Sequence, residues 1–197
     1  MTDRPDLAAL IGSRICHDLV SPIGAICNGV ELMVMERGRT SPELDLIADS
    51  VTSANAKLRF FRLAFGASGG QRVARAEVQS ILAAYVSATR LAISWTSDPD
   101  LSRGEVKVLL LSLLCLETAM PWGGRVSVLQ GPARWSVLAE APRLKIDPGL
   151  WGSLQAPEPG LEVTPALVQF PLLAEDLRRS GRRFSAELGD GTIRLEL

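Results

Sequence analysis

The sequence contains a single histidine, His17, so any imidazole chemistry that the protein performs must use this residue. The surrounding segment, residues 13–22, reads SRICHDLVSP. A neutral imidazole nitrogen is a nucleophile near neutral pH, and it can accept a phosphoryl group. Phosphorylation of His17 is therefore one hypothesis, and an ordinary surface histidine is the alternative. A metal site is not expected, because the chain has no second histidine and no Cys-x-x-Cys motif.

The position of His17 on its predicted helix indicates an exposed side chain. At about 100° per residue, an α-helix places residue 17 about 200° from Ile15 and from Leu19, which belong to the apolar stripe. Arg14 could offset the charge of a phosphohistidine, and Asp18 could support the reaction as a nearby acid. The predicted neighbours of His17 on this face are small or polar, which would let another protein approach: Ser13, Arg14, Ser21, Gly24, Asn28 and Glu31.

Two long helices must position His17. The first runs from about residue 7 to residue 37, because its apolar residues recur at steps of three and four. The segment Ser41-Pro42-Glu43 then supplies an N-cap, a proline at the first helical position and an acid in the first turn. The second helix continues to about Phe65, with apolar residues that alternate spacings of three and four over about three heptads.

Two helices joined by a short connection form an antiparallel hairpin with two apolar faces to cover. Self-association into a four-helix bundle, as a homodimer, covers both faces. Packing of the second face onto the C-terminal half of the same chain is the alternative. The residues predicted for the core of the dimeric bundle are Ile23, Ile26, Val30, Leu44, Ile47, Val51, Leu58 and Phe61.

The flexible segment GASGG, residues 66–70, predicts a boundary between domains at 1–68 and 69–197. The second domain mixes helices and strands, so the predicted fold class is α+β, with an α/β sandwich after the helical hairpin. Strands are expected at 91–96, 125–130, 134–140, 183–188 and 192–197. Helices are expected at 77–90, 102–120 and 166–180, whereas residues 142–159 are not assigned.

Composition limits the partners and the compartment. The 197 residues carry 21 Lys and Arg against 22 Asp and Glu, so nothing in the charge favours nucleic acid or an anionic membrane. The longest nearly unbroken apolar run, residues 108–116, is too short to span a bilayer, and the N-terminus lacks the pattern of a secretory signal. Reduced cysteines and a cytoplasmic location are therefore expected.

The pattern His17-Asp18-x-x-x-Pro22 resembles the H-box of sensor histidine kinases, in which an acid follows the phospho-accepting histidine and a proline lies five positions on. The C-terminal half resembles their ATP-binding domain, of the histidine-kinase and Hsp90-like ATPase fold, through the apolar helix before Gly123-Gly124 and the closing hairpin at Gly191-Thr192. The match runs over nearly the whole chain.

The chain departs from this kinase pattern where a kinase holds its nucleotide. The helix before Gly123 contains Ser112, Cys115 and Glu117, but it has no asparagine for magnesium and phosphates. An Asp-x-Gly-x-Gly box is missing, and only Asp147-Pro148-Gly149 is distantly similar. Without these groups nothing would cradle a triphosphate, so no bound cofactor, no ATPase activity and no autokinase activity are expected.

A kinase-like hairpin with a degenerate second domain is similar to the ChpT family of histidine phosphotransferases, and the segment around His17 is close to that family's signature. The resemblance implies a phosphorelay protein that accepts a phosphoryl group on His17 from the receiver domain of a hybrid histidine kinase (CckA-like). It would pass the group to response regulators (CtrA-like, CpdR-like), with Mg²⁺ on the receiver. Two alternatives stay open: a truncated, autophosphorylating histidine kinase, and a non-catalytic dimeric scaffold.

Overall fold

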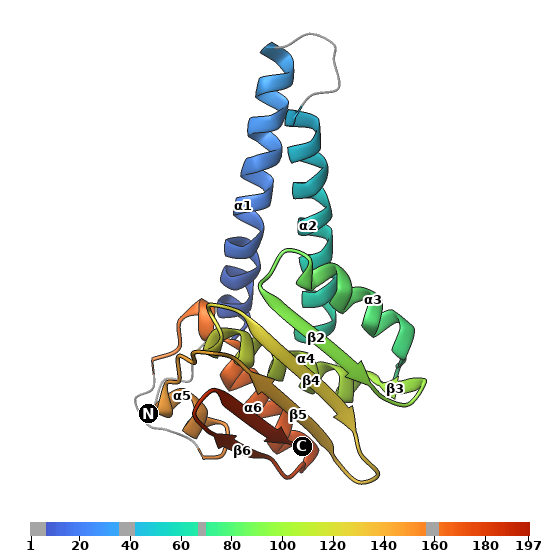
Figure 1. Ribbon diagram of the computed structural model, residues 1–197, viewed down its shortest axis with the longest axis vertical. Coiled ribbons are helices and arrows are strands. Elements are labelled where there is room, and N and C mark those ends of the chain that lie inside the picture. Colours follow the sequence, from blue (N-terminus) through green and yellow to red (C-terminus); the bar gives the residue numbers. More distant parts are fainter. Residues whose placement is uncertain (1–6, 36–41, 67–69, 157–161) are drawn as a thin grey trace.

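The computed structural model describes residues 7–35, 42–66, 70–156 and 162–197. Helices α1 (Leu7–Met35) and α2 (Pro42–Phe65) form an antiparallel hairpin that rises from the α/β part of the chain (Figure 1). The predicted helical hairpin is therefore confirmed within one chain. Several side chains of α1, His17 among them, lie outside the described set, as does the predicted domain boundary between residues 68 and 69.

The two helices of the hairpin approach closely at small residues. Pro22 and Gly29 are buried residues of α1, whereas Ile23 and Val30 beside them are 52% and 48% exposed. A Cβ atom at Gly29 would lie 2.8 Å from Cδ1 of Ile47 and within 3.1 Å of the α2 backbone. Helix α1 therefore contacts α2 where its side chains are smallest, and Ile23 and Val30 lie beside that contact rather than in it.

The last turns of α2 belong to the core of the second half. Phe60 and Phe61 are almost fully buried, and the ring of Phe60 stacks on Tyr85 with 4.1 Å between centroids. Ala64 is also fully buried. The hairpin is thus joined to the α/β part by a shared hydrophobic core as well as by the chain.

In the described residues after the hairpin, the chain forms seven strands and four further α-helices. Strands β2, β4, β5, β7 and β6 form one sheet in that order, with β2 and β4 parallel and the other pairs antiparallel. Strands β1 and β3 form a separate antiparallel pair. The elements are β1 (Arg72–Ala74), α3 (Arg75–Val86), β2 (Leu91–Thr96), β3 (Asp100–Ser102), α4 (Arg103–Ala119), β4 (Gly124–Gln130), β5 (Trp135–Glu140), α5 (Pro148–Ser153), the 3-10 helix η1 (Pro165–Leu167), α6 (Gln169–Ser180), β6 (Ser185–Leu188) and β7 (Thr192–Glu196).

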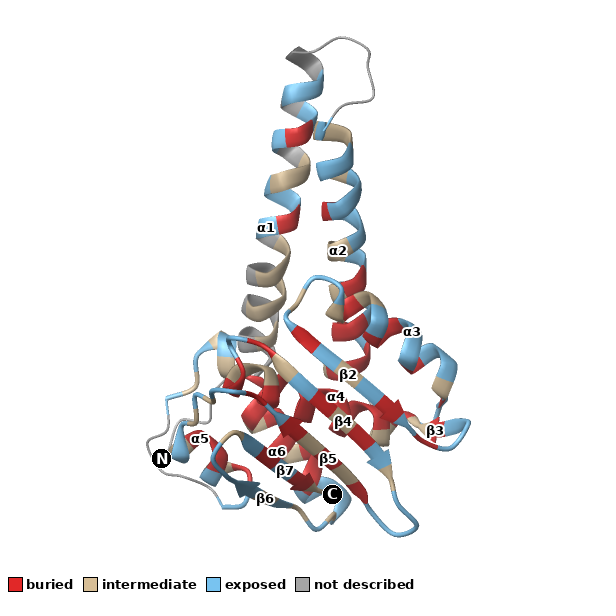
Figure 2. Cartoon of the chain, viewed as in Figure 1, coloured by how far each residue is buried: buried red, intermediate tan, exposed pale blue. Residues whose placement is uncertain are grey.

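Helices α4 and α6 lie against one face of this sheet (Figure 1). Side chains alternate along each strand, so Val126 and Val128 of β4 are fully buried while Leu129 is 49% exposed. Exposed positions of the strands are visible between buried ones in Figure 2. The predicted α+β class with an α/β sandwich is confirmed.

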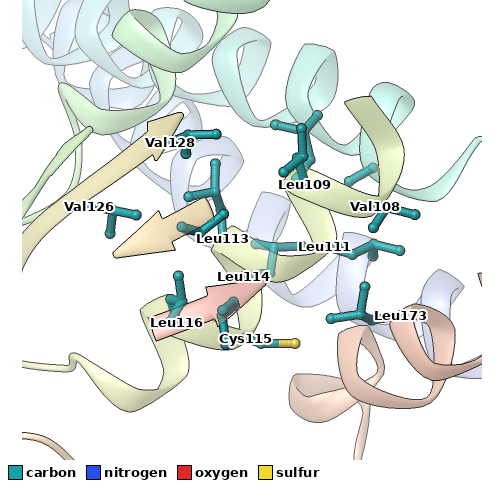
Figure 3. Close-up of a cluster of buried hydrophobic side chains, with 14 of the residues drawn as sticks. Val108, Leu109, Leu111, Leu113, Leu114, Cys115, Leu116, Val126, Val128 and Leu173 are labelled. Carbon is teal, nitrogen blue, oxygen red and sulfur yellow. The ribbon is translucent and has the colours of Figure 1, made fainter. Parts of the chain in front are cut away.

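Helix α4 is the centre of the core. A capping box starts it: Ser102 accepts a hydrogen bond from the backbone of Glu105, whose side chain accepts one from the backbone of Ser102. Figure 3 shows Leu113 on the side of Val126 and Val128, while Leu111 and Cys115 lie on the side of Leu173 from α6. Both Leu111 and Cys115 are 0% exposed. The helix is therefore packed on opposite faces, which its continuous apolar sequence requires.

Two features of the second half differ from the sequence-based expectation. The unassigned segment 142–159 contains α5, which Asp147 caps by accepting hydrogen bonds from two backbone N–H groups. The short strands β1 and β3 were not predicted. Trp122 lies in the turn after α4 and is 48% exposed, and Arg143 stacks on its ring at 4.1 Å.

Candidate functional site

The turn of α1 that carries His17 lies at the junction between the hairpin and the second half. The backbone of His17 is helical, and its side chain is outside the described set. Arg14 and Asp18 flank it one helical turn apart, and both are held by described contacts. The geometry of the site is therefore given by the neighbours of His17, and its predicted exposure stays a prediction.

Arg14 joins α1 to the second half. Its Nε donates to Oδ2 of Asp18 at 2.8 Å, and its Nη1 donates to the carbonyl oxygen of Ala166 at 2.8 Å. The side chains of Arg14 and Asp18 are only 17% and 14% exposed, so solvent screens this pair less than an ordinary surface pair. Arg14 was predicted to face a docking partner, but its guanidinium is occupied by these two groups.

Asp18 has a second contact through its backbone. The ammonium of Lys57, from α2, donates to the carbonyl oxygen of Asp18 at 3.3 Å. Its side chain accepts from Arg14, so the residue is bound at both its carboxylate and its backbone. The predicted supporting acid therefore stands in a charged cluster with Arg14 and Lys57, directly after His17 in the chain.

The second half supplies a buried carboxyl group to the same region. Tyr85 of α3 donates a hydrogen bond from its hydroxyl to Oε2 of Glu117 on α4 at 2.8 Å. Burial raises the pKa of the Glu117 carboxyl, and the hydrogen bond from Tyr85 opposes that rise. Burial, together with the charge of Glu117, raises the pKa of Tyr85.

A cavity of about 350 Å³ lies between these groups. Its walls come from α1 and α2 on one side, and from α3, the start of β2 and the end of α4 on the other. Cationic and acidic side chains face it from both parts of the chain. The residues around it are Arg14, Asp18, Lys57, Tyr85, Ala88, Thr89, Arg90, Leu91, Glu117, Met120, Pro121 and Gly123.

The other residues predicted for docking follow the outer side of α1. Ser21, Gly24 and Asn28 are exposed, and a Cβ at Gly24 would meet no atom within 4 Å. The side chains of Ser13 and Glu31 lie outside the described set. An open strip of small residues therefore begins one turn beyond His17.

The residues predicted for the bundle core divide into three groups by their exposure in one chain. Phe61 is 2% exposed and is covered by its own chain. Ile26, Leu44 and Ile47 are half-buried between the helices. The remaining predicted residues are exposed on one chain, at 52% for Ile23, 48% for Val30, 40% for Val51 and 45% for Leu58.

Sequence reasoning missed Lys57, Tyr85, Glu117 and Ala166. Glu117 had a usable signal, since it is the only acidic residue in the apolar run 106–120. A lone carboxyl in such a helix requires a partner, which Tyr85 provides. The other three join the site only through tertiary contacts, because the backbone of Ala166 and the amine of Lys57 reach α1 across the fold.

Within the described ranges, no cluster of His, Cys, Asp and Glu side chains is arranged to hold a metal ion. Among the helices described, none has both the length and the apolar character needed to cross a membrane.

Comparisons with known proteins agree with one another. Residues 75–192 match the family described as "Histidine phosphotransferase C-terminal domain". The protein phosphotransferase ChpT of Brucella abortus (strain 2308) is 37% identical over 150 residues, which cover 73% of this chain and 71% of that protein. A solved structure of a bacterial phosphotransferase superposes with a TM-score of 0.83 at 30% identity, covering 100% of this chain and 97% of that one.

Proposed function

The chain belongs to the histidine phosphotransferase family, and from this premise we propose that it carries a phosphoryl group on His17 between receiver domains of a phosphorelay. The observation that carries the proposal is the place of the sole histidine. It stands on the helical hairpin of a family member, between Arg14 and Asp18, at the start of an exposed strip of small residues.

The proposed reaction is an exchange of one phosphoryl group. A ring nitrogen of His17 attacks the phosphorus of a receiver's aspartyl phosphate; the new P–N bond forms as the P–O bond to the aspartate breaks. The carboxylate released stays on the receiver with its Mg²⁺, which neutralises the charge in transfer. The reverse reaction loads a second receiver, so the direction follows the supply of phosphorylated partners.

A hybrid histidine kinase of the CckA-like type would supply the phosphoryl group, and response regulators of the CtrA-like and CpdR-like types would receive it. Ser21, Gly24 and Asn28 are small and exposed, which suits the approach of a receiver to α1. Trp122, exposed in the turn after α4 and stacked by Arg143, would give the receiver a contact on the second half. Such partners would place the protein in the cytoplasm.

We also propose that two chains form a four-helix bundle. Ile23 and Val30 stand seven positions apart on α1, and Val51 and Leu58 stand seven apart on α2, all of them exposed on one chain. A spacing of seven places such pairs on one side of a helix. Their exposure supports a dimer, because a second hairpin would remove four large apolar side chains from water.

No nucleotide is part of this proposal. The face of α4 that carries Leu111 and Cys115 is packed against α6, and both side chains are fully buried. The same helix has no asparagine to hold magnesium and phosphates, which supports a protein that obtains its phosphoryl group only from a partner, rather than a truncated kinase.

Incubation with a phosphorylated receiver domain tests the proposal. We expect an acid-labile, base-stable phosphate on this chain and none on His17→Ala, which should fold like the natural protein. Labelling of His17 by ATP alone would instead indicate a kinase. Transfer between two receivers that persists in His17→Ala would indicate a scaffold.

A further inference from the structure

Pro22 interrupts the hydrogen bonding of α1 beside the phospho-acceptor. In an α-helix the carbonyl of residue 18 accepts from the N–H of residue 22, but proline has no N–H to donate. Pro22 lies inside α1 and is buried. The turn that follows His17 therefore lacks one of the bonds that would hold a regular helix together, at the residue directly after the histidine.

Lys57 supplies a donor at that point. Its ammonium reaches from α2 to the carbonyl oxygen of Asp18, at 3.3 Å, across 39 positions of sequence. The site is partly buried, so the bond is shielded from water. Meanwhile the carboxylate of Asp18 is held by Arg14. The residue after His17 is thus fixed to α2 by its backbone and to its own helix by its side chain.

We propose that Lys57 is a positioning residue for phosphoryl transfer: it gives the Asp18 carbonyl the hydrogen bond that Pro22 cannot give. The turn that carries His17 is then held in one orientation relative to α2. Transfer between a histidine and an aspartate depends mainly on positioning, so a loose turn would slow the chemical step more than the docking of a receiver. This inference rests on the proposed function.

A double-mutant cycle isolates this role. Lys57→Met removes the donor, and Pro22→Ala restores an N–H at residue 22 for the Asp18 carbonyl. We expect Lys57→Met to lower kcat for transfer from a phosphorylated receiver by roughly tenfold, with KM nearly unchanged, because a charged donor is lost from a partly buried acceptor. In the Pro22→Ala background, Lys57→Met should lower kcat by less than about twofold.

Two further variants complete the design. Lys57→Arg keeps a cationic donor and should retain most of kcat. Arg179→Met, which removes an exposed cation of α6, should leave kcat unchanged. An equal loss from Lys57→Met in both backgrounds would overturn the proposal, since it would show that the ammonium acts by its charge and not through the Asp18 carbonyl.

Hydrogen exchange separates this proposal from the proposed function. Amides of residues 19–26 should exchange faster in Lys57→Met than in the natural protein, and at the natural rate in Arg179→Met. This result does not depend on phosphoryl transfer, so it stands even if no receiver phosphorylates His17. Unchanged exchange in Lys57→Met would overturn the pairing of Lys57 with Asp18, whatever the activity.

Discussion

The guanidinium of Arg14 donates to the carbonyl oxygen of Ala166 at 2.8 Å, which joins residues 152 positions apart. Ala166 belongs to η1, and its carbonyl also accepts from the side-chain amide of Gln169, which in turn bonds Thr118 of α4. The helix that carries His17 is therefore connected to the central helix of the second half through Arg14. The hairpin and the second half are therefore linked by a hydrogen bond at the candidate site itself.

Arg14→Ala should lower the free energy of unfolding by about 1–2 kcal/mol, because it removes a partly buried ion pair and a bond to a backbone carbonyl. Arg179→Ala is a matched control. Arg179 forms an ion pair of the same spacing and length with Glu175, but the two side chains are 69% and 43% exposed. Its loss should cost less than about 0.5 kcal/mol in urea unfolding. If the two variants lose the same free energy of unfolding, the role of Arg14 in linking the hairpin to the second half is contradicted.

Glu117 should make stability depend on pH. Its pKa is raised above the ordinary value of 4.5 by burial, so the folded state holds the proton more tightly than the unfolded state. That stabilising contribution is complete below pH 4.5 and is lost as the pH rises through the folded pKa. Glu117→Gln has no proton to lose and can still accept from Tyr85. It should therefore gain stability relative to the natural protein as the pH rises.

Urea unfolding of Glu117→Gln and the natural protein at about pH 4 and about pH 8 measures this difference. Glu175→Gln changes an exposed acid on α6. Its free energy of unfolding relative to the natural protein should be nearly the same at both pH values. If the difference in free energy of unfolding between Glu117→Gln and the natural protein is the same at both pH values, the raised pKa of Glu117 is contradicted.

Leu111→Ala should lower the free energy of unfolding by about 2–5 kcal/mol, because Leu111 is fully buried where α4 packs on α6 and its truncation leaves a cavity that the surroundings fill only in part. Leu46→Ala changes the same side chain where it is 45% exposed, and should cost less than about 1 kcal/mol. Similar costs at both positions would mean that the face of α4 toward α6 is loosely packed.

The elements of the second half were predictable where local signals were strong. The strand at Leu91–Thr96 and the two strands around Gly131 have bounded apolar runs, and both predictions are confirmed. Helix α5 carries the same signal as α2, an N-cap residue followed by proline, at Asp147-Pro148. The signal was present there, but the surrounding prolines and glycines obscured it.

The site was predictable only in part, because its contacts are tertiary. The pattern around His17 predicts a phospho-acceptor and a supporting acid at Asp18, but no local pattern shows that Lys57 contacts the Asp18 carbonyl or that Arg14 contacts Ala166. The apolar stripe of α1 did not show which of its residues contact α2 within one chain. Helices approach most closely at small residues, so Gly29 lies in the contact while Ile23 faces outward.

Substitution of exposed apolar residues on the hairpin tests the proposed dimer. Val51→Glu combined with Leu58→Glu should convert a dimer to a monomer in light scattering. Burial of each side chain is worth about 1.5–3 kcal/mol, so the pair of changes should weaken association by roughly a hundredfold or more. Leu129→Glu is the control, because Leu129 is 49% exposed on the sheet, away from the hairpin, and should leave the dimer intact. A natural protein that is monomeric at all accessible concentrations, or a dimer that survives both glutamates, would place these side chains outside any interface.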